Sequence, residues 1–265
     1  WDQMRRAFEQ HGWDGEWYVR YFDHLGTPIG SSRAEKGRIW INSNTWAVLS
    51  GFASADRAQT ALDSVDRHLN TKYGLKLSAP GYDGFDREIG GVTTYPPGAK
   101  ENGGIFLHTN PWAIIANTLL GDGDRAFRYY TQINPAAKND LIEMYEAEPY
   151  CYPQNILGDE HPQFGLARNT WLSGTSSWTY VAATQHILGL RPEVDGLRID
   201  PCLPSDWPGF TAVRKFRGAT YRVEVTKPLG ICRGVKSVTV DGTVLGANLV
   251  PVLAAGTHEV RVVMG

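Results

Sequence analysis

Cysteine is scarce in this sequence, and its three cysteines, Cys151, Cys202 and Cys232, stand far apart. None of them has the close cysteine or histidine neighbours of a zinc site, so no metal is expected. Scattered cysteines with no disulfide pattern favour a reducing compartment such as the cytoplasm.

Long hydrophobic runs and an excess of one charge are also missing. No stretch approaches the roughly 18 apolar residues of a membrane span, and there is no signal-peptide pattern. The formal net charge is −2, with no charged tail. We therefore expect neither a membrane nor a nucleic acid as a partner. A helical pattern is already under way at residues 1–8, which lack an initiating methionine, so we expect a longer natural chain.

Aromatic residues are plentiful, with nine Trp and twelve Tyr among 265 residues. Aromatic faces beside polar groups suit sugar rings, although aromatic side chains are also ordinary core residues. The length allows one large domain, or a large domain and a small one.

Four segments have the apolar spacing or the end signals of helices, over 55–70, 110–121, 124–133 and 173–188. Ser54 is a candidate N-cap for the first, and Asn110 followed by Pro111 for the second. The last segment is weakly amphipathic, which indicates a buried helix.

After Pro192 the pattern changes to the alternation that is typical of strands, at 197–200, 221–225, 238–244 and 258–262. Asp241-Gly242 is a hairpin-turn signal. We therefore predict a mainly α protein, with concentric helices over residues 1–195 and a small antiparallel β domain over 196–265.

Two loops carry residue types that bind anions or sugars. The loop 94–109 holds Lys100, Glu101 and His108 among prolines and glycines, and His108 lies just before an expected helix N-terminus. Helix N-termini offer free N–H groups and positive dipole to an anion. The second loop, 172–178, has the small residues that let an anion approach the backbone. Each has an ordinary alternative, a local hydrogen bond for His108 and a plain helix cap for Ser173.

Two groups of carboxylates are candidates for general acid/base work: Asp14 with Glu16, and Glu146 with Glu148. Carboxylates beside aromatic residues are also frequent structural acceptors. No nucleophile-elbow motif is present.

Several motifs occur in a fixed order along the chain. They are Trp13-Asp14-Gly15-Glu16-Trp17-Tyr18, Tyr95-Pro96-Pro97-Gly98, Lys100-Glu101-Asn102-Gly103-Gly104, His108-Thr109-Asn110-Pro111-Trp112, Glu148-Pro149-Tyr150, Trp171-Leu172-Ser173-Gly174-Thr175, Leu188-Gly189-Leu190-Arg191-Pro192 and Ile199-Asp200-Pro201-Cys202-Leu203-Pro204. This series resembles glycoside hydrolase family 94, the cellobiose, cellodextrin, cellobionate and chitobiose phosphorylases.

The resemblance implies an (α/α)6 helical barrel followed by a jelly-roll-like β domain. It also implies inverting, reversible phosphorolysis of a β-linked disaccharide or oligosaccharide to an α-sugar 1-phosphate. Inorganic phosphate is then a co-substrate, and no cofactor is expected. A homodimer is compatible with the resemblance.

The resemblance also assigns residues. The phosphate contacts fall on His108, Ser173 and Gly174. The sugar contacts fall on Lys100, Glu101 and Gln154, and an acceptor-side tyrosine falls on Tyr95.

Two departures from the family matter. Gly91 stands where cellobiose-type members have a glutamate, so the acceptor should differ. The Asp-Trp-Asn-Asp motif that carries the family's general acid is absent, and we expect it in a missing N-terminal half; Asp14 reads as structural. The isolated chain should then be inactive.

Two other interpretations stay open. One is a helical-barrel glycoside hydrolase or lyase, which a requirement for phosphate would distinguish from a phosphorylase. The other is a non-catalytic carbohydrate-binding fragment.

Overall fold

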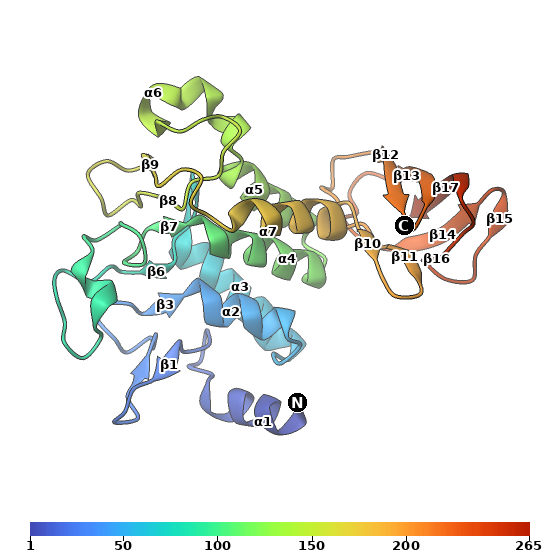
Figure 1. The fold of residues 1–265 in the computed structure, drawn as a ribbon. Coiled ribbons are helices and arrows are strands. Elements are labelled where there is room, and N and C mark those ends of the chain that lie inside the picture. Colours follow the sequence, from blue (N-terminus) through green and yellow to red (C-terminus); the bar gives the residue numbers. More distant parts are fainter. The chain divides into compact units, whose positions relative to one another are not determined.

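The computed structural model describes all residues from Trp1 to Gly265 (Figure 1). They form two compact units. The first unit contains residues 1–116 and 129–178, and the second contains residues 117–128 and 179–265. The domain limits expected from the sequence, 1–195 and 196–265, stay a prediction. No helix combines the length and the apolar composition that crossing a membrane requires.

The first unit contains most of the helices. They are α1 (Asp2–His11), α2 (Ile41–Leu49), α3 (Ala55–Leu69), the start of α4 (Asn110–Leu120), the end of α5 (Gly123–Ile133), α6 (Ile142–Tyr145) and the start of α7 (Thr175–Val181), with short 3-10 turns at Gly91–Thr94, Leu107–Thr109 and Pro135–Leu141. The helices expected over 55–70, 110–121 and 124–133 are therefore confirmed.

The first unit also contains short antiparallel strand pairs between its helices. The strands are β1 (Tyr21–Phe22), β2 (Pro28–Ile29), β3 (Ile39–Trp40), β4 (Asn70–Thr71), β5 (Gly74–Leu75), β6 (Ser78–Ala79), β7 (Ile105–Phe106), β8 (Asn155–Ile156) and β9 (Ala167–Arg168). They pair as β1–β2, β3–β6, β4–β5 and β7–β8–β9. The last sheet joins the segments that carry His108 and Gln154.

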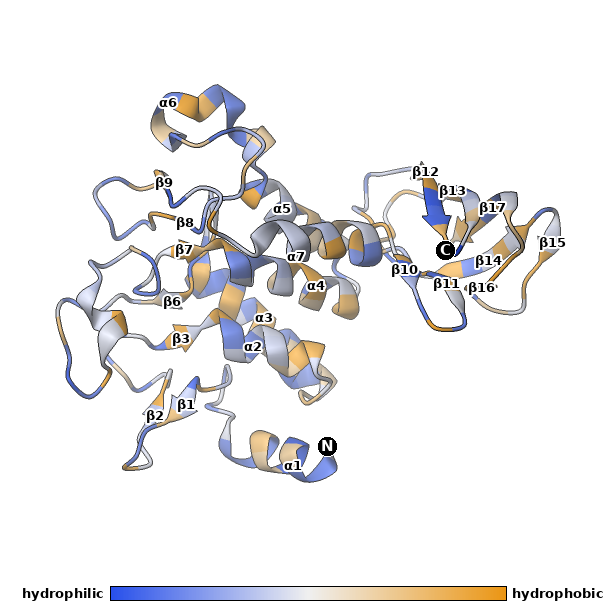
Figure 2. Ribbon diagram, viewed as in Figure 1, coloured by the Kyte–Doolittle hydropathy of each residue, from blue (hydrophilic) through white to orange (hydrophobic).

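The helix α3 shows why the periodic segments fold as expected. Ala58, Ala61, Leu62, Val65 and Leu69 are buried on one face, and Figure 2 shows hydrophilic and hydrophobic residues alternating along it. The residue before the helix, Ser54, occupies the N-cap position, but its side chain makes no capping hydrogen bond.

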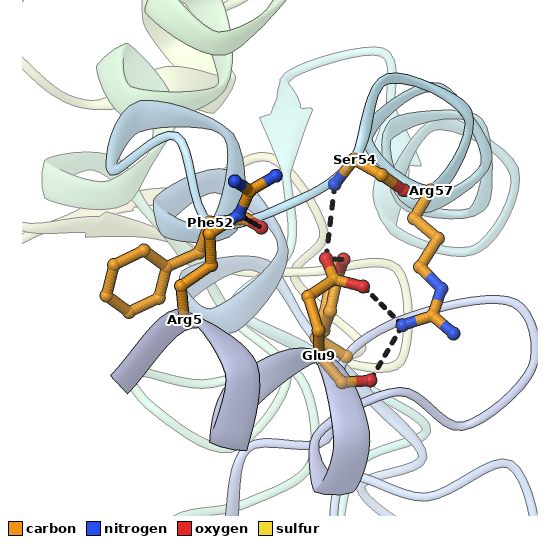
Figure 3. Close-up of polar contacts among 6 residues, drawn as sticks. Arg5, Glu9, Phe52, Ser54 and Arg57 are labelled. Carbon is orange, nitrogen blue, oxygen red and sulfur yellow. Dashed lines mark hydrogen bonds and ion pairs between the residues drawn. The ribbon is translucent and has the colours of Figure 1, made fainter. Parts of the chain in front are cut away.

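Helix α1 has no fully buried residue, and polar contacts (Figure 3) join the packing of Phe8 against Tyr18 in holding it. The Glu9 carboxylate accepts hydrogen bonds from the Ser54 amide (3.1 Å) and the Tyr18 hydroxyl (2.7 Å), and it forms an ion pair with Arg57. Arg5 donates to the carbonyl of Phe52 (3.2 Å). These contacts attach α1 to α3 and to the loop before it.

The second unit contains two sheets. Strands β10 (Leu190–Pro192), β11 (Gly196–Ile199) and β16 (Leu249–Pro251) form one. The other has the order β12 (Gly209–Phe216), β13 (Ala219–Thr226), β17 (Gly256–Met264), β14 (Val235–Val240) and β15 (Thr243–Val244). Along β13 the buried residues alternate, at Ala219, Tyr221, Val223 and Val225. The hairpin between β14 and β15 is confirmed, since Asp241 and Gly242 have φ values of 49° and 84°.

The predicted fold class is wrong. The structure has seven helices with 33% of its residues helical and 25% in strands, which is a mixed α/β fold and not the mainly α (α/α)6 barrel that was expected. The connections read as loops contain strand pairs of only two residues, and such short elements leave no periodic signal. The helix expected over 173–188 is α-helical only over Thr175–Val181, and a π-helix follows over Ala182–Ile187.

One pairing departs from the antiparallel arrangement expected for the β domain. Strands β13 and β17 run parallel over their full length, with Ala219 opposite Gly256 and Thr226 opposite Val263. Residues 227–255 separate the two strands, which is long enough for the crossover that a parallel pair requires. Alternation predicts that a segment is a strand, but it does not predict the direction of its partner.

Candidate functional site

A cavity of the first unit has a volume of about 750 Å³. Its wall contains three of the residues assigned from the sequence, Tyr95, Glu101 and His108, as well as Gly91. Arg20, Trp40, Asn42 and Trp112 also line it. The structure therefore brings residues from four separate segments around one space large enough for a small sugar.

The loop before Glu101 is shaped by the buried side chain of Asn102. Its amide oxygen accepts from the Tyr82 amide (2.7 Å), and its amide nitrogen donates to the carbonyls of Tyr82 (2.9 Å) and Tyr95 (2.7 Å). These bonds fix residue 95 beside residue 101. The Glu101 atom Oε2 is buried and has no hydrogen-bond partner. A buried carboxylate oxygen without a donor is costly unless a ligand supplies one, and sugar hydroxyls are suitable donors.

His108 lies between β7 and α4 on a backbone that is tied down on both sides. The amide of Leu107 donates to the carbonyl of Gln154 (3.0 Å). The Asn110 side-chain oxygen accepts from the amide of Leu75 (2.7 Å), and its side-chain nitrogen donates to the carbonyl of Leu75 (3.0 Å). The imidazole packs against the Trp112 ring, with 5.4 Å between ring centroids. Asn110 was expected to cap α4, but its side chain holds the neighbouring β5 instead.

The turn around Gly174 lies against the imidazole of His108. A Cβ atom placed on Gly174 would be 2.9 Å from His108 Cε1 and 3.2 Å from Nδ1. The structure thus brings together two loops that are far apart in the sequence. The hydroxyl of Ser173 accepts from the amide of Thr175 (3.1 Å) and pairs with its hydroxyl, so it also serves as a local cap.

Lys100 and Gln154 are not among the lining residues of this cavity. The ammonium of Lys100 lies 5.3 Å from the centre of the Tyr95 ring. Gln154 contributes its main chain, which bonds to Leu107 and to the carbonyl of Asn169 (3.0 Å).

The four other candidate carboxylates do not line the cavity. Asp14 accepts from the amide of Ser32, and Glu16 forms an exposed ion pair with Arg67 (3.4 Å). The Glu146 carboxylate oxygen Oε2 lies 3.9 Å from the guanidinium nitrogen Nη1 of Arg168. The Trp171 indole donates to Glu148 (2.9 Å) and thereby lowers the pKa of that carboxyl. Their contacts are those of structural acceptors.

Arg20, Asn42 and Trp112 were not assigned a role from the sequence. Asn42 Oδ1 and Trp112 Nε1 are buried without a partner, and both residues line the cavity. Arg20 is exposed overall, but partial burial of its guanidinium lowers the pKa of that group. Trp112 belongs to a motif of the sequence, but no local pattern marks Arg20 or Asn42, because they reach the cavity from a distant segment.

Comparison with known proteins supports the resemblance. Residues 1–189 match the family described as Glycosyl hydrolase 94 superfamily, catalytic domain. The chain belongs to this family. The match includes all of the cavity residues and Gly174, and it ends before β10.

Several curated relatives cover nearly the whole chain. N,N'-diacetylchitobiose phosphorylase of Vibrio proteolyticus is 47% identical over 264 residues, 99% of this chain and 33% of that protein. The enzyme of the same name from Vibrio furnissii is 44% identical, over 99% of this chain and 33% of that protein. Solabiose phosphorylase of Paenibacillus borealis is 34% identical, over 99% of this chain and 34% of that protein. The chain therefore spans about one third of the length of these relatives.

Proposed function

We propose that the complete protein containing this chain is a glycoside phosphorylase that cleaves a β-linked disaccharide with inorganic phosphate. The contact between His108 and the Gly174 turn, beside a cavity with an unpartnered Glu101 oxygen, carries this proposal. Two relatives are named N,N'-diacetylchitobiose phosphorylase, so this disaccharide is the substrate that we propose.

In the proposed reaction a phosphate oxygen attacks the anomeric carbon from the face opposite the glycosidic bond. That bond breaks, and a carboxylic acid protonates the leaving oxygen. The product is an α-sugar 1-phosphate. Because phosphate is the nucleophile, the protein needs no nucleophilic side chain and contributes by binding and aiming its two substrates.

His108, Ser173 and Gly174 are the proposed phosphate contacts. The imidazole and the backbone of the turn lie together, and they supply the donors that a phosphate requires. Ser173 can donate its hydroxyl proton while its oxygen keeps the bond from Thr175.

The proposed sugar contacts are Glu101, Lys100 and Gln154, with Tyr95 on the acceptor side. Glu101 has the strongest support, because a hydroxyl of the sugar would give its buried oxygen the missing donor. The proposed general acid belongs to a part of the protein outside these 265 residues, since their sequence has no Asp-Trp-Asn-Asp motif.

A single assay tests this function. The complete protein is incubated with N,N'-diacetylchitobiose with and without phosphate, and the products are followed by ³¹P NMR for the sugar phosphate and by ¹H NMR for the free sugars. We expect N-acetyl-α-glucosamine 1-phosphate and one equivalent of N-acetylglucosamine, only when phosphate is present. Release of both sugars without phosphate would identify a hydrolase and contradict the proposal.

A further inference from the structure

A second cavity, of about 340 Å³, shares two lining residues with the first, Arg20 and Asn42. The remainder of its lining is largely apolar and includes Phe8, Trp46 and Phe52. The side chains of Arg20 and Asn42 therefore stand where the two cavities meet. We call this pair of residues the junction.

The guanidinium of Arg20 has no carboxylate partner. Its carbon Cζ lies 5.7 Å from the centre of the Trp40 ring, so the guanidinium is placed against an aromatic face. Its backbone is fixed, because the Arg20 amide donates to the carbonyl of Ile29 (2.7 Å) and a Cβ on Gly30 would lie 2.7 Å from the Arg20 nitrogen. Arg20 thus offers hydrogen-bond donors from a side chain that rests on the Trp40 ring.

Asn42 supplies the complementary atom. Its Oδ1 is buried and receives no hydrogen bond. Since Asn42 is the second residue of α2, its position is fixed by that helix. The junction therefore combines an exposed guanidinium that has no carboxylate partner with a buried acceptor that has no donor, and the buried acceptor marks a place for a ligand.

We propose that the junction recognises the acetamido group of a bound amino sugar. The acetamido carbonyl accepts from Arg20, its N–H donates to Asn42 Oδ1, and its methyl group enters the second cavity. A sugar hydroxyl has no methyl group to fill the second cavity, so it would leave the apolar residues there in contact with water. This inference rests on the proposed function, because it names a recognition point within the same substrate site.

Binding measurements on the complete protein test the inference without turnover. N-acetylglucosamine and glucose are titrated in the presence of phosphate into the wild-type protein and into Arg20→Met, which keeps most of the aliphatic stem and removes the donors. Removing a hydrogen bond to a charged group should weaken N-acetylglucosamine binding about tenfold to a hundredfold. Glucose binding should change by less than about threefold, because glucose lacks the acetamido carbonyl.

Arg67→Met is the matched control, since Arg67 forms an exposed ion pair with Glu16 and lines neither cavity. It should leave the binding of both sugars unchanged. Arg20→Lys should restore part of the N-acetylglucosamine affinity, because it returns a charged donor. Circular dichroism shows whether each variant is folded.

An equal loss for both sugars in Arg20→Met, or a wild-type protein that binds glucose as tightly as N-acetylglucosamine, would overturn the inference. A protein that prefers N-acetylglucosamine through Arg20 but shows no phosphorolysis would overturn only the proposed function. Phosphorolysis of disaccharides without any preference for an acetamido group would overturn only this inference.

Discussion

The imidazole of His108 is held by contacts with two different segments. It packs on the ring of Trp112, and it lies against the backbone of Gly174, where the absence of a Cβ leaves room for the ring. A side chain that is already ordered loses less conformational freedom when it binds a ligand. His108 is therefore suited to hold an anion in one position.

Gly174→Ala tests this arrangement at the residue scale. The new Cβ would lie 2.9 Å from His108 Cε1, so the imidazole must move away from the turn. We expect the KM for phosphate in the complete protein to rise about tenfold, as for the loss of one hydrogen bond to a charged group, with sugar binding unchanged. Kinetics at varied phosphate concentration measure the effect.

Gly246→Ala is the control for that substitution. A Cβ on the exposed Gly246 meets no atom within 4 Å, so this variant should keep the wild-type KM for phosphate. If Gly174→Ala also kept it, His108 would not depend on the turn, and the proposed pairing would be wrong.

At the scale of the elements, buried asparagine side chains connect segments that no regular sheet or helix joins. Asn44 accepts from the amide of Tyr18 (2.9 Å) and donates to the carbonyl of Trp40 (2.8 Å), while Asn102 and Asn110 hold the backbones of Tyr82 and Leu75 in the same way. Each of these side chains supplies hydrogen-bond partners to backbone groups of a buried loop, which would otherwise have none. These bonds position the loops that form the cavity.

The polar contacts of helix α1 make part of its attachment dependent on pH. Burial alone would raise the pKa of Glu9, but the hydrogen bonds from Tyr18 and Ser54 and the charge of Arg57 outweigh it and lower the pKa below its usual 4.5. A carboxyl group with a lowered pKa in the folded state stabilises that state above its unfolded pKa. The stabilisation is lost as the pH falls through the folded pKa.

Glu9→Gln should therefore destabilise the protein near pH 7 by about 1.5–3 kcal/mol, the usual range for hydrogen bonds to a charged group. The difference from the wild type should shrink as the pH falls below the usual pKa of 4.5. Urea unfolding of both proteins across this pH range measures it. A difference that stays constant down to acid pH would show that the Glu9 charge does not hold α1.

How much of the fold the sequence predicts depends on the length of each element. Helix α3 and strands β13 and β17 have enough residues to show a period, and each lies where the pattern predicts. The two-residue strands have no period, and the parallel pairing of β13 with β17 depends on the path of the chain between them. The fold class was wrong because it was inferred from the long elements alone.

The same distinction applies to the site. Tyr95, Glu101 and His108 belong to one loop whose composition and motifs indicate ligand binding, and all three line the cavity. Arg20 and Asn42 reach the same cavity through long-range contacts, such as those of Asn44, that leave no mark in the local sequence.

At the scale of the whole molecule, the chain is one third as long as its N,N'-diacetylchitobiose phosphorylase relatives. We predict that the isolated 265-residue chain shows no phosphorolysis of N,N'-diacetylchitobiose, because its sequence lacks the motif of the expected general acid. Assay of the isolated chain beside the complete protein tests this. Turnover by the chain alone would show that a carboxylate within it, with Glu101 in the cavity as the first candidate, acts as the acid.

The central claim is that His108 and the Gly174 turn hold the attacking phosphate. The most direct test is the KM for phosphate of the complete protein and of its His108→Ala variant, at a saturating concentration of N,N'-diacetylchitobiose. We predict a KM for phosphate that rises about tenfold to a hundredfold, with sugar binding largely unchanged, because one charge-assisted hydrogen bond to the anion is removed. A folded variant with an unchanged KM for phosphate would contradict the claim.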